Sequence, residues 1–289
     1  MTPPGARDLF VRVNGLRLHL LDWGSDGGTT ILCVHATGYL AALWQPVALA
    51  LRAQAHVLSL DLPGHGDSEP APSYNWSILA DYVGGVLSEL GPTVLVGHSV
   101  GGATSAICAA RYPQLVRGMA LVDPVILPEP YYAHPEASES SDFYGTSRRR
   151  RAWPSREAMR ESLQSKIPYV RWQPSIFDLF VQEGVRETDD GQVALKCTPE
   201  TEAEVYRQTL SYNMWPEIAH ADVPAIVLRG LSKEGFGSTT APDLAGRLRQ
   251  ADDRPLAHAS HHIPMEDPEA VAAAVRDLLS RLSWVSGCS

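Results

Sequence analysis

The strongest indication of chemistry in the sequence is a serine with a glycine two residues before it and another two residues after it. Ser99 lies in the run Gly97-His98-Ser99-Val100-Gly101, directly after the apolar segment 93–96 and before a helical pattern. This order is typical of a nucleophile elbow, in which a sharp strand-to-helix turn exposes a serine hydroxyl. Because such a turn is strained and crowded, small residues are needed two before and two after the serine, as Gly97 and Gly101 are. The run predicts covalent catalysis by Ser99 on a carbonyl group.

Two adjacent histidines near the C-terminal end are the candidates for a general base. His261 and His262 stand in the segment 259–269, which also contains Glu266. A serine hydroxyl needs a base to take its proton as it attacks, and imidazole titrates close to neutral pH. The chemistry of the two side chains alone does not distinguish them.

Two further motifs follow apolar runs in the N-terminal third of the chain. The run 31–34 leads into His35-Ala36-Thr37-Gly38-Tyr39, and the run 56–60 leads into a turn at 61–68 that contains two glycines. Together with the serine run, these motifs resemble those of the α/β-hydrolase family, and the resemblance extends over nearly the whole chain. Ala36 stands where the family usually has glycine, which narrows the loop slightly.

The resemblance implies a role for each of these segments. The backbone amides of Thr37 and Val100 would form an oxyanion hole, and the turn 61–68 would be structural. The family commonly places its catalytic histidine five residues before a glutamate, which favours His261 because Glu266 follows it at that spacing. The resemblance implies no metal ion and no organic cofactor.

The acid that would orient the base has two candidates. Most members of the family carry it after the strand that follows the lid, where this chain has Lys233 with Glu234 one residue later. Asp123, 24 residues after Ser99, stands at the alternative position, just before the lid. A lysine cannot stabilise an imidazolium, and either carboxylate position can reach the same histidine.

A narrower resemblance favours Asp123 over Glu234. The motifs His-Ala-Thr-Gly, Gly-His-Ser-Val-Gly-Gly and Asp-Pro-Val-Ile-Leu-Pro are similar to those of a subgroup of bacterial hydrolases. More loosely, they resemble fungal toxin-pathway hydrolases, which include the acyl-CoA hydrolase of mycophenolic acid synthesis. That relative uses an aspartate at the position of Asp123.

The elements that must position these residues alternate between short apolar runs and helical patterns. Such alternation is typical of βαβ units and a mostly parallel sheet. We therefore predict an α/β-hydrolase fold, with an eight-stranded, mostly parallel sheet flanked by helices. Residues 1–124 and 217–289 are expected to form the core, and residues 125–216 an inserted helical lid. Within the core, 16–23 is the expected antiparallel leading strand.

The lid is expected to cover the ends of the strands, where ligands bind in open α/β sheets. Its aromatic residues, Tyr144, Trp153, Trp172 and Trp215 among them, are candidate walls of a substrate pocket, although aromatic residues also build the core of a lid. The stretch 142–172 contains Arg148–Arg151 and further cations. It is either an anion-capturing surface, for example for coenzyme A, or a solvated face paired with nearby glutamates.

Composition limits the class of partner. The formal charge of −9 argues against nucleic acid and anionic membranes, which both require a basic surface. The first residues lack the apolar core of a signal peptide, and no stretch reaches the roughly 18 apolar residues of a membrane helix. We expect a cytoplasmic protein that acts on a small hydrophobic molecule, with a homodimer as an open alternative to a monomer.

These inferences predict a serine hydrolase that cleaves an ester, a thioester such as an acyl-CoA, or a lactone through an acyl-enzyme. Two alternatives remain open at the level of the sequence. The same residues can serve carbon–carbon bond hydrolysis, acyl transfer or cyclisation, because one fold hosts many chemistries. The chain could also be a ligand receptor with a vestigial catalytic site.

Overall fold

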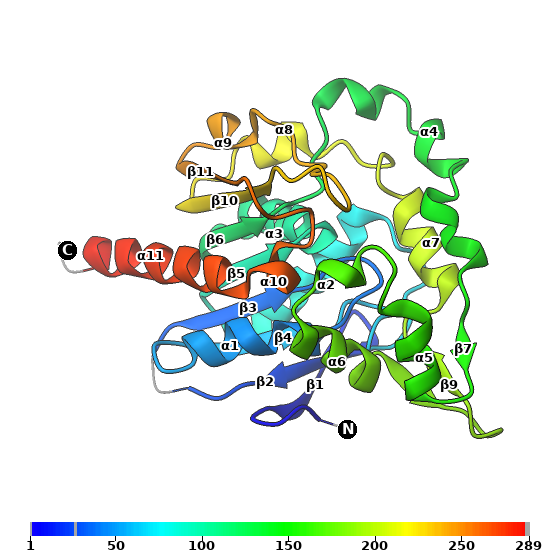
Figure 1. Ribbon diagram of the computed structural model, residues 1–289. Helices are drawn as coiled ribbons and strands as arrows, with labels where there is room; N and C mark the ends of the chain where they lie inside the picture. Colours follow the sequence, from blue (N-terminus) through cyan, green and yellow to red (C-terminus); the bar gives the residue numbers. More distant parts are fainter. Residues whose placement is uncertain (1, 26–27, 287–289) are drawn as a thin grey trace.

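The computed structural model describes residues 2–25 and 28–286, without the side chains of Tyr144 and of residues 283–286. Eight strands form one sheet in the order β1-β2-β4-β3-β5-β6-β10-β11 (Figure 1). Their bounds, in that order, are Arg7–Val13, Leu16–Asp22, His56–Leu60, Thr30–Val34, Thr93–His98, Val116–Val122, Ala225–Gly230 and Ala251–Leu256. Within the described residues, β2 pairs antiparallel with both β1 and β4, and every other pair in this sheet is parallel. The predicted α/β-hydrolase sheet, mostly parallel with an antiparallel strand, is confirmed.

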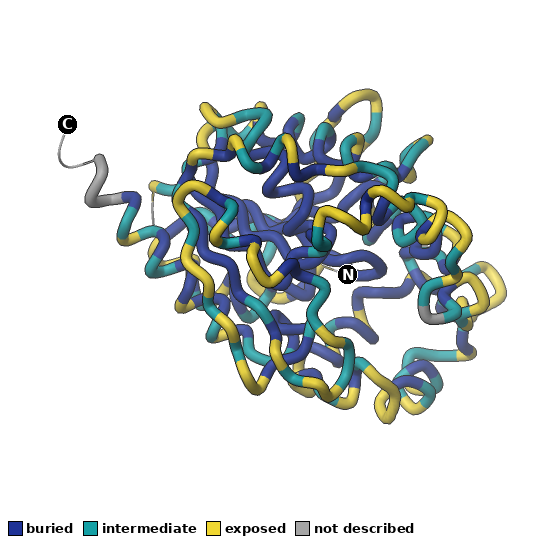
Figure 2. The backbone as a smooth tube through the Cα atoms, turned by 90° about the horizontal axis from the view of Figure 1, so that it is seen from above, coloured by how far each residue is buried: buried dark blue, intermediate teal, exposed yellow. Residues whose placement is uncertain are grey.

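Both faces of the sheet are covered by helices. On β3, Ile31 and Cys33 belong to one core cluster and Leu32 and Val34 to the other, because successive side chains of a strand point to opposite faces. The first cluster includes residues of α1 (Gln45–Leu51) and α11 (Pro268–Ser286), and the second includes residues of α2 (Trp76–Leu90) and α3 (Val100–Arg111). Figure 2 shows the resulting buried interior. This double burial explains the continuous apolar runs of the parallel strands.

Two local features are visible only in the structure. The helix α2 begins at Trp76, because Asn75 is the N-cap and its side chain accepts a hydrogen bond from the Ser77 amide. The strand β1 was not expected from the sequence. It lies at the edge of the sheet, and most of its side chains are exposed, so it carries no apolar run.

The segment after β6 forms the lid and leaves the sheet at the ends of the strands. It contains η2 (Glu129–Ala133), α4 (Glu136–Glu139), η3 (Phe143–Arg148), α5 (Arg156–Leu163), η4 (Tyr169–Arg171), α6 (Pro174–Glu183), α7 (Pro199–Arg207) and the start of α8 (Trp215–Ile218). It also contains a three-stranded antiparallel sheet of β7 (Ala152–Trp153), β9 (Val193–Leu195) and β8 (Val185–Glu187). The inserted segment is thus mainly helical, and its small sheet is an addition that the sequence did not indicate, because strands of two or three residues leave little periodic signal.

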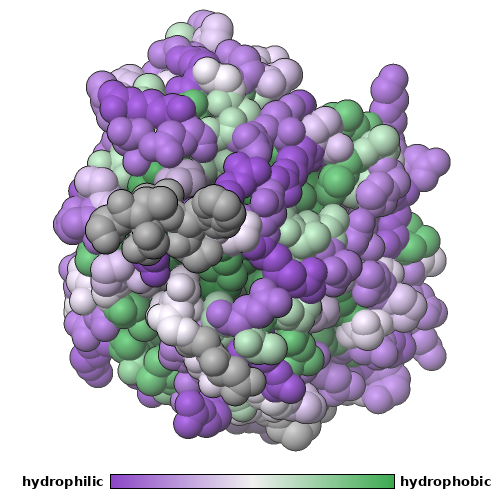
Figure 3. All heavy atoms as spheres, turned by 90° about the vertical axis from the view of Figure 1, so that its left-hand side faces the viewer, coloured by the Kyte–Doolittle hydropathy of each residue, from purple (hydrophilic) through white to green (hydrophobic). Residues whose placement is uncertain are grey.

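Three short helices complete the core: η1 (Ala41–Trp44), α9 (Leu244–Arg247) and α10 (Ile263–Glu266). On the face toward which α11 extends, hydrophilic side chains predominate and hydrophobic ones form separate areas between them (Figure 3). Within the described residues, no helix combines the length and the apolar character needed to cross a membrane.

Candidate active site

Ser99 sits on a strained turn between β5 and α3. Its φ of 58° and ψ of −120° lie in a region that side chains rarely adopt. Two glycines permit this turn. A Cβ added to Gly97 would lie 2.3 Å from the carbonyl oxygen of Gly101, and one added to Gly101 would lie 2.2 Å from that of Val34. The glycines expected from the sequence are thus required by close backbone contacts.

Three side chains from distant parts of the chain meet at this turn. The Nε2 atom of His261 lies 3.1 Å from Ser99 Oγ, and its Nδ1 atom lies 2.6 Å from Asp123 Oδ2. Asp123 is fully buried, and its other oxygen, Oδ1, accepts hydrogen bonds from the Gly230 amide and the Ser238 hydroxyl. With Nδ1–H bonded to the carboxylate, Nε2 is left to accept the serine proton. This is the geometry of a serine nucleophile, its base and an orienting acid.

The structure separates the two candidate acids. Glu234 follows β10, but its side chain is 83% exposed and pairs with Arg171 at 2.7 Å. Asp123 instead follows β6, with an unusual φ of 41° that turns the chain toward the lid. The structure therefore brings Asp123, and not Glu234, to His261.

The segment that carries His261 is fixed to the nucleophile turn. His98, the residue before Ser99, donates from Nε2 to the carbonyl oxygen of His261 at 2.9 Å. The amide of His261 donates to the carbonyl of Phe236 at 2.9 Å. Burial, reinforced by repulsion from His261, lowers the pKa of His98 well below its usual value, so this ring stays neutral. The segments that carry Ser99 and His261 are therefore joined by this hydrogen bond to the His261 backbone as well as by the contact between the two side chains.

His262 does not reach Ser99. Its ring is buried against Phe236, Trp172 and Tyr39, at centroid distances between 5.4 and 6.0 Å. Burial is the main cause of a pKa far below the usual value for this histidine. The neighbour of the expected base thus belongs to the wall of the site.

The loop that carries Thr37 is held by hydrogen bonds to the turn at 61–68. The ring of His65 accepts at Nε2 from the Gly38 amide at 3.0 Å, and Asp61 accepts from the Ala41 amide at 2.6 Å. Val100 is the first residue of α3, where a helix leaves its amides without intrahelical acceptors. The Thr37 loop is thus held by buried polar contacts, and the Val100 amide lies at the start of a helix directly after Ser99.

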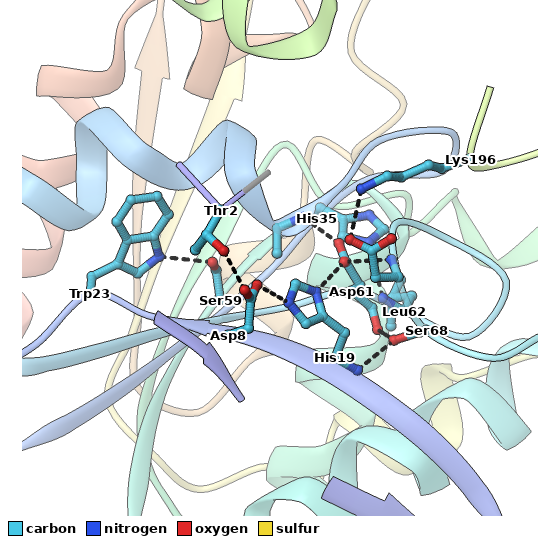
Figure 4. A network of polar contacts seen from close by, with 12 residues as sticks. Thr2, Asp8, His19, Trp23, His35, Ser59, Asp61, Leu62, Ser68 and Lys196 are labelled. Atoms are coloured by element: carbon cyan, nitrogen blue, oxygen red, sulfur yellow. Dashed lines mark hydrogen bonds and ion pairs between the residues drawn. The ribbon is translucent and has the colours of Figure 1, made fainter. Parts of the chain in front are cut away.

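Asp61 is also the centre of a buried polar network (Figure 4). His19 bridges Asp61 at 2.7 Å and Asp8 at 2.9 Å, and Ser68 donates to the Asp61 carbonyl at 2.6 Å. Although burial opposes a charge on His19, its hydrogen bonds to these carboxylates raise its pKa above the usual value. Among the described residues, His19, Asp61 and Asp67 are the one group that could gather around a metal ion. Because Asp61 already accepts from several protein donors, we assign the group a structural role.

We predict that stability will fall on acidification below about pH 6.5, the pKa of histidine in an unfolded chain. Burial, with repulsion from His35, lowers the pKa of His65 to about 3, so below pH 6.5 only the unfolded state takes up this proton. Between pH 6.5 and 5, His65 alone is expected to cost about 2 kcal/mol of unfolding free energy. Urea unfolding at pH 7 and pH 5 measures this loss.

The matched variant for this measurement is H65Q, whose amide oxygen can still accept from Gly38. Its unfolding free energy is expected to depend less steeply on pH than that of the parent protein. The difference in slope should correspond to about one proton fewer taken up on unfolding. An unfolding free energy that stays constant from pH 7 to pH 5 would contradict the assignment.

A cavity of about 490 Å³ opens beside Ser99, a size typical of small-molecule sites. Its reactive end is formed by Thr37, Ser99, His261 and His262, and its aromatic wall by Tyr39, Trp76, Phe143, Trp153, Tyr169, Tyr206 and Phe236. The described lining also includes four residues with charged side chains: Arg149, Arg150, Lys166 and Glu202. Lid and core therefore enclose a mainly apolar chamber beside Ser99.

Of the three lid residues expected to bind substrate whose side chains the structure describes, only Trp153 lines this cavity. Trp172 is buried behind the wall, in contact with Tyr39 and Tyr169. Trp215 lies where the inserted segment returns to the core. Its Nε1 donates to the carbonyl of Leu127 at 2.8 Å, and Arg247 stacks on its ring. The side chain of Tyr144 is outside the described part of the structure. Large apolar rings serve equally well in a core, and the sequence does not distinguish the two uses.

A largely buried ion pair that lines the cavity was not expected from the sequence. Arg149 donates to Glu202 at 2.7 Å and to the hydroxyl of Tyr169. Burial opposes the charge on Arg149, but Tyr169 and Glu202 outweigh it and raise its pKa. A Cβ on Gly38 would lie 2.7 Å from Glu202 Oε1, so the pair packs directly against the Thr37 loop. Lid and loop are thereby in contact beside the reactive serine.

The model of the alpha/beta hydrolase family matches residues 31–274. This chain belongs to the α/β-hydrolase family. The hydrolase is similar to the esterase Rv0045c of Mycobacterium tuberculosis, with 27% identity over 93% of this chain and 88% of that one. It is also similar to the 2-(acetamidomethylene)succinate hydrolase of Mesorhizobium japonicum, with 25% identity over 93% of this chain and 94% of that one.

Similarity in three dimensions leads to the same fold. The crystal structure of E-2-(acetamidomethylene)succinate hydrolase has a TM-score of 0.78 and 23% identity to this hydrolase, covering 95% of this chain and 99% of that one. At this identity the likeness shows the fold alone. The narrower resemblance to the toxin-pathway hydrolases receives no support from these relatives.

Proposed function

We propose that this α/β hydrolase is a serine hydrolase that cleaves a carboxylic ester, a thioester or a lactone through an acyl-enzyme. The observation that carries the proposal is the placement of His261 between Ser99 Oγ, at 3.1 Å, and Asp123 Oδ2, at 2.6 Å. A hydrolase of the same family named an esterase, with 27% identity, supports the choice of bond.

In the proposed reaction His261 takes the proton of Ser99 as Oγ attacks the carbonyl carbon. The amides of Thr37 and Val100 then hold the negatively charged oxygen, each contributing about 3 kcal/mol to the lowering of the barrier. His261 returns the proton to the leaving group, and the acyl group stays on Ser99. Water, activated by the same histidine, releases the acid and restores the serine.

The proposal predicts that a fluorophosphonate probe will label Ser99 and that short-chain p-nitrophenyl esters will be turned over. Mass spectrometry of the labelled peptide identifies the residue, and the S99A variant, with a folded far-UV spectrum, should show neither labelling nor turnover. Turnover retained in S99A would overturn the nucleophile assignment.

The other readings of the site give different outcomes in the same experiment. Labelling of Ser99 without hydrolysis of any ester, thioester or lactone would indicate another reaction of the same residues, such as carbon–carbon cleavage or acyl transfer. Absence of both labelling and turnover, with ligand binding unaffected by S99A, would indicate a receptor. Each outcome excludes the hydrolytic proposal.

A further inference from the structure

The basic stretch of the lid divides into two groups of cations. Residues 142–172 contain eight arginines and lysines. Six of them pair with carboxylates: Arg148 with Asp142, Arg149 with Glu202, Arg151 with Glu200, Arg156 with Glu187, Arg160 with Asp178, and Arg171 with Glu234 and Glu266. The remaining two, Arg150 and Lys166, have no carboxylate partner in the described part of the chain.

These two unmatched cations line the cavity of Ser99. Both residues are also exposed, so they reach the cavity from its solvent side. Arg150 is oriented there, because its Nε donates to the Ala152 carbonyl at 2.8 Å and its guanidinium carbon lies 5.4 Å from the centre of the Trp153 ring. That bond uses one edge of the guanidinium and leaves its terminal nitrogens for another acceptor.

The charges of the cavity do not cancel. Glu202 is the one carboxylate among the described residues that line the cavity. It is bonded to Arg149, and the two charges neutralise each other. Arg150 and Lys166 therefore leave an excess of two positive charges in the cavity of a protein whose net charge is −9. A wholly hydrophobic substrate would have no use for this excess.

We propose that the substrate carries an anionic group, a carboxylate or a phosphate, that binds Arg150 and Lys166 while its scissile carbonyl lies at Ser99. The proposal rests on the proposed function and adds a substrate class to it. A guanidinium pairs with both kinds of anion through two parallel hydrogen bonds, and an ammonium acts as a point charge beside it. The partly enclosed cavity strengthens this attraction because water screens it less than at an open surface.

The test compares two matched pairs of substrates. One pair places the charge on the acyl group: p-nitrophenyl hemiglutarate, which carries a carboxylate, against neutral p-nitrophenyl butyrate. The other places it on the leaving group: butyryl-CoA, which carries phosphates, against the neutral butyryl thioester of N-acetylcysteamine. For each pair the selectivity is the kcat/KM of the anionic member divided by that of the neutral one.

We expect the parent protein to favour the anionic member of one pair by about tenfold or more, the value of a charge-assisted hydrogen bond. The pair that shows this preference identifies which half of the substrate is charged. The R150M/K166M double variant should lose most of the preference. R148M is the matched control, because Arg148 is the neighbouring arginine but does not line the cavity, and it should keep the preference.

Two results would overturn the inference: a parent protein without preference in either pair, or a double variant that retains the preference. Failure of the proposed function would give a different result. In that case Ser99→Ala would not reduce turnover of either neutral substrate, or neither would be turned over at all. Thermal unfolding of each variant shows whether it is folded. If the double variant is not folded, the single variants R150M and K166M are compared instead.

Discussion

Replacing Asp123 by asparagine is expected to lower kcat/KM by about four orders of magnitude. The reason lies in how the carboxylate is held. Oδ1 accepts from Gly230 and Ser238, so the oxygen of the new amide will stay with these donors and its nitrogen will face His261. An N–H group in that position favours the tautomer of His261 that carries its proton on Nε2, which cannot accept the serine proton. Steady-state hydrolysis of a p-nitrophenyl ester measures the effect.

The control for this substitution is E234Q. The exposed side chain of Glu234 pairs with Arg171, and an exposed ion pair contributes only about 1 kcal/mol or less to stability. We expect kcat/KM of this variant to stay within about twofold of the parent value, because the change leaves His261 and its contacts intact. If E234Q were the more damaging of the two variants, the acid would have to be reassigned.

Replacing Gly101 by alanine is expected to destabilise the protein by at least about 3 kcal/mol. The added Cβ would lie 2.2 Å from the carbonyl oxygen of Val34, on the central strand β3, and neither backbone can withdraw without disturbing the sheet. The fraction of G101A that folds should also lack esterase activity, because relieving the clash displaces α3 and with it Ser99. Urea unfolding and ester hydrolysis together report both effects.

Gly246 offers a matched control within the same chain. A Cβ at this position in α9 meets no atom within 4 Å, and its φ is outside the left-handed region. G246A should therefore be neutral or stabilising by up to about 1 kcal/mol, from the higher helix propensity of alanine. Equal destabilisation by both variants would mean that crowding at the elbow is not the cause.

The sequence was most informative where backbone geometry restricts the choice of residue. The nucleophile turn was predictable because only glycine fits at 97 and 101, and the buried parallel strands because both their faces are covered. Asp123 could be considered as the acid because an aspartate ends a buried strand just before the lid. Its proximity to His261, 138 residues later, depends on the fold and is visible only in the structure.

The lid was the least predictable part, for a physical reason. Trp153 and Trp215 have the same apolar side chain, but Trp153 lines the cavity, whereas Trp215 donates a hydrogen bond to the Leu127 carbonyl where the lid joins the core. The environment of each depends on long-range packing. The same holds for the basic stretch. Whether an arginine is neutralised depends on partners such as Glu202, which lies 53 residues from Arg149.

The bond from Trp215 to the Leu127 carbonyl also bears on how such a protein can diversify. It joins the point where the chain leaves the core to the point where it returns, so the lid is a loop closed at its base. Since the entropy of closing a loop grows only slowly with its length, a longer or shorter insert could be carried by the same base at little cost. Asp123 and His261 lie on the core side of that junction. A change in the length of the lid can therefore leave the positions of Asp123 and His261 unchanged.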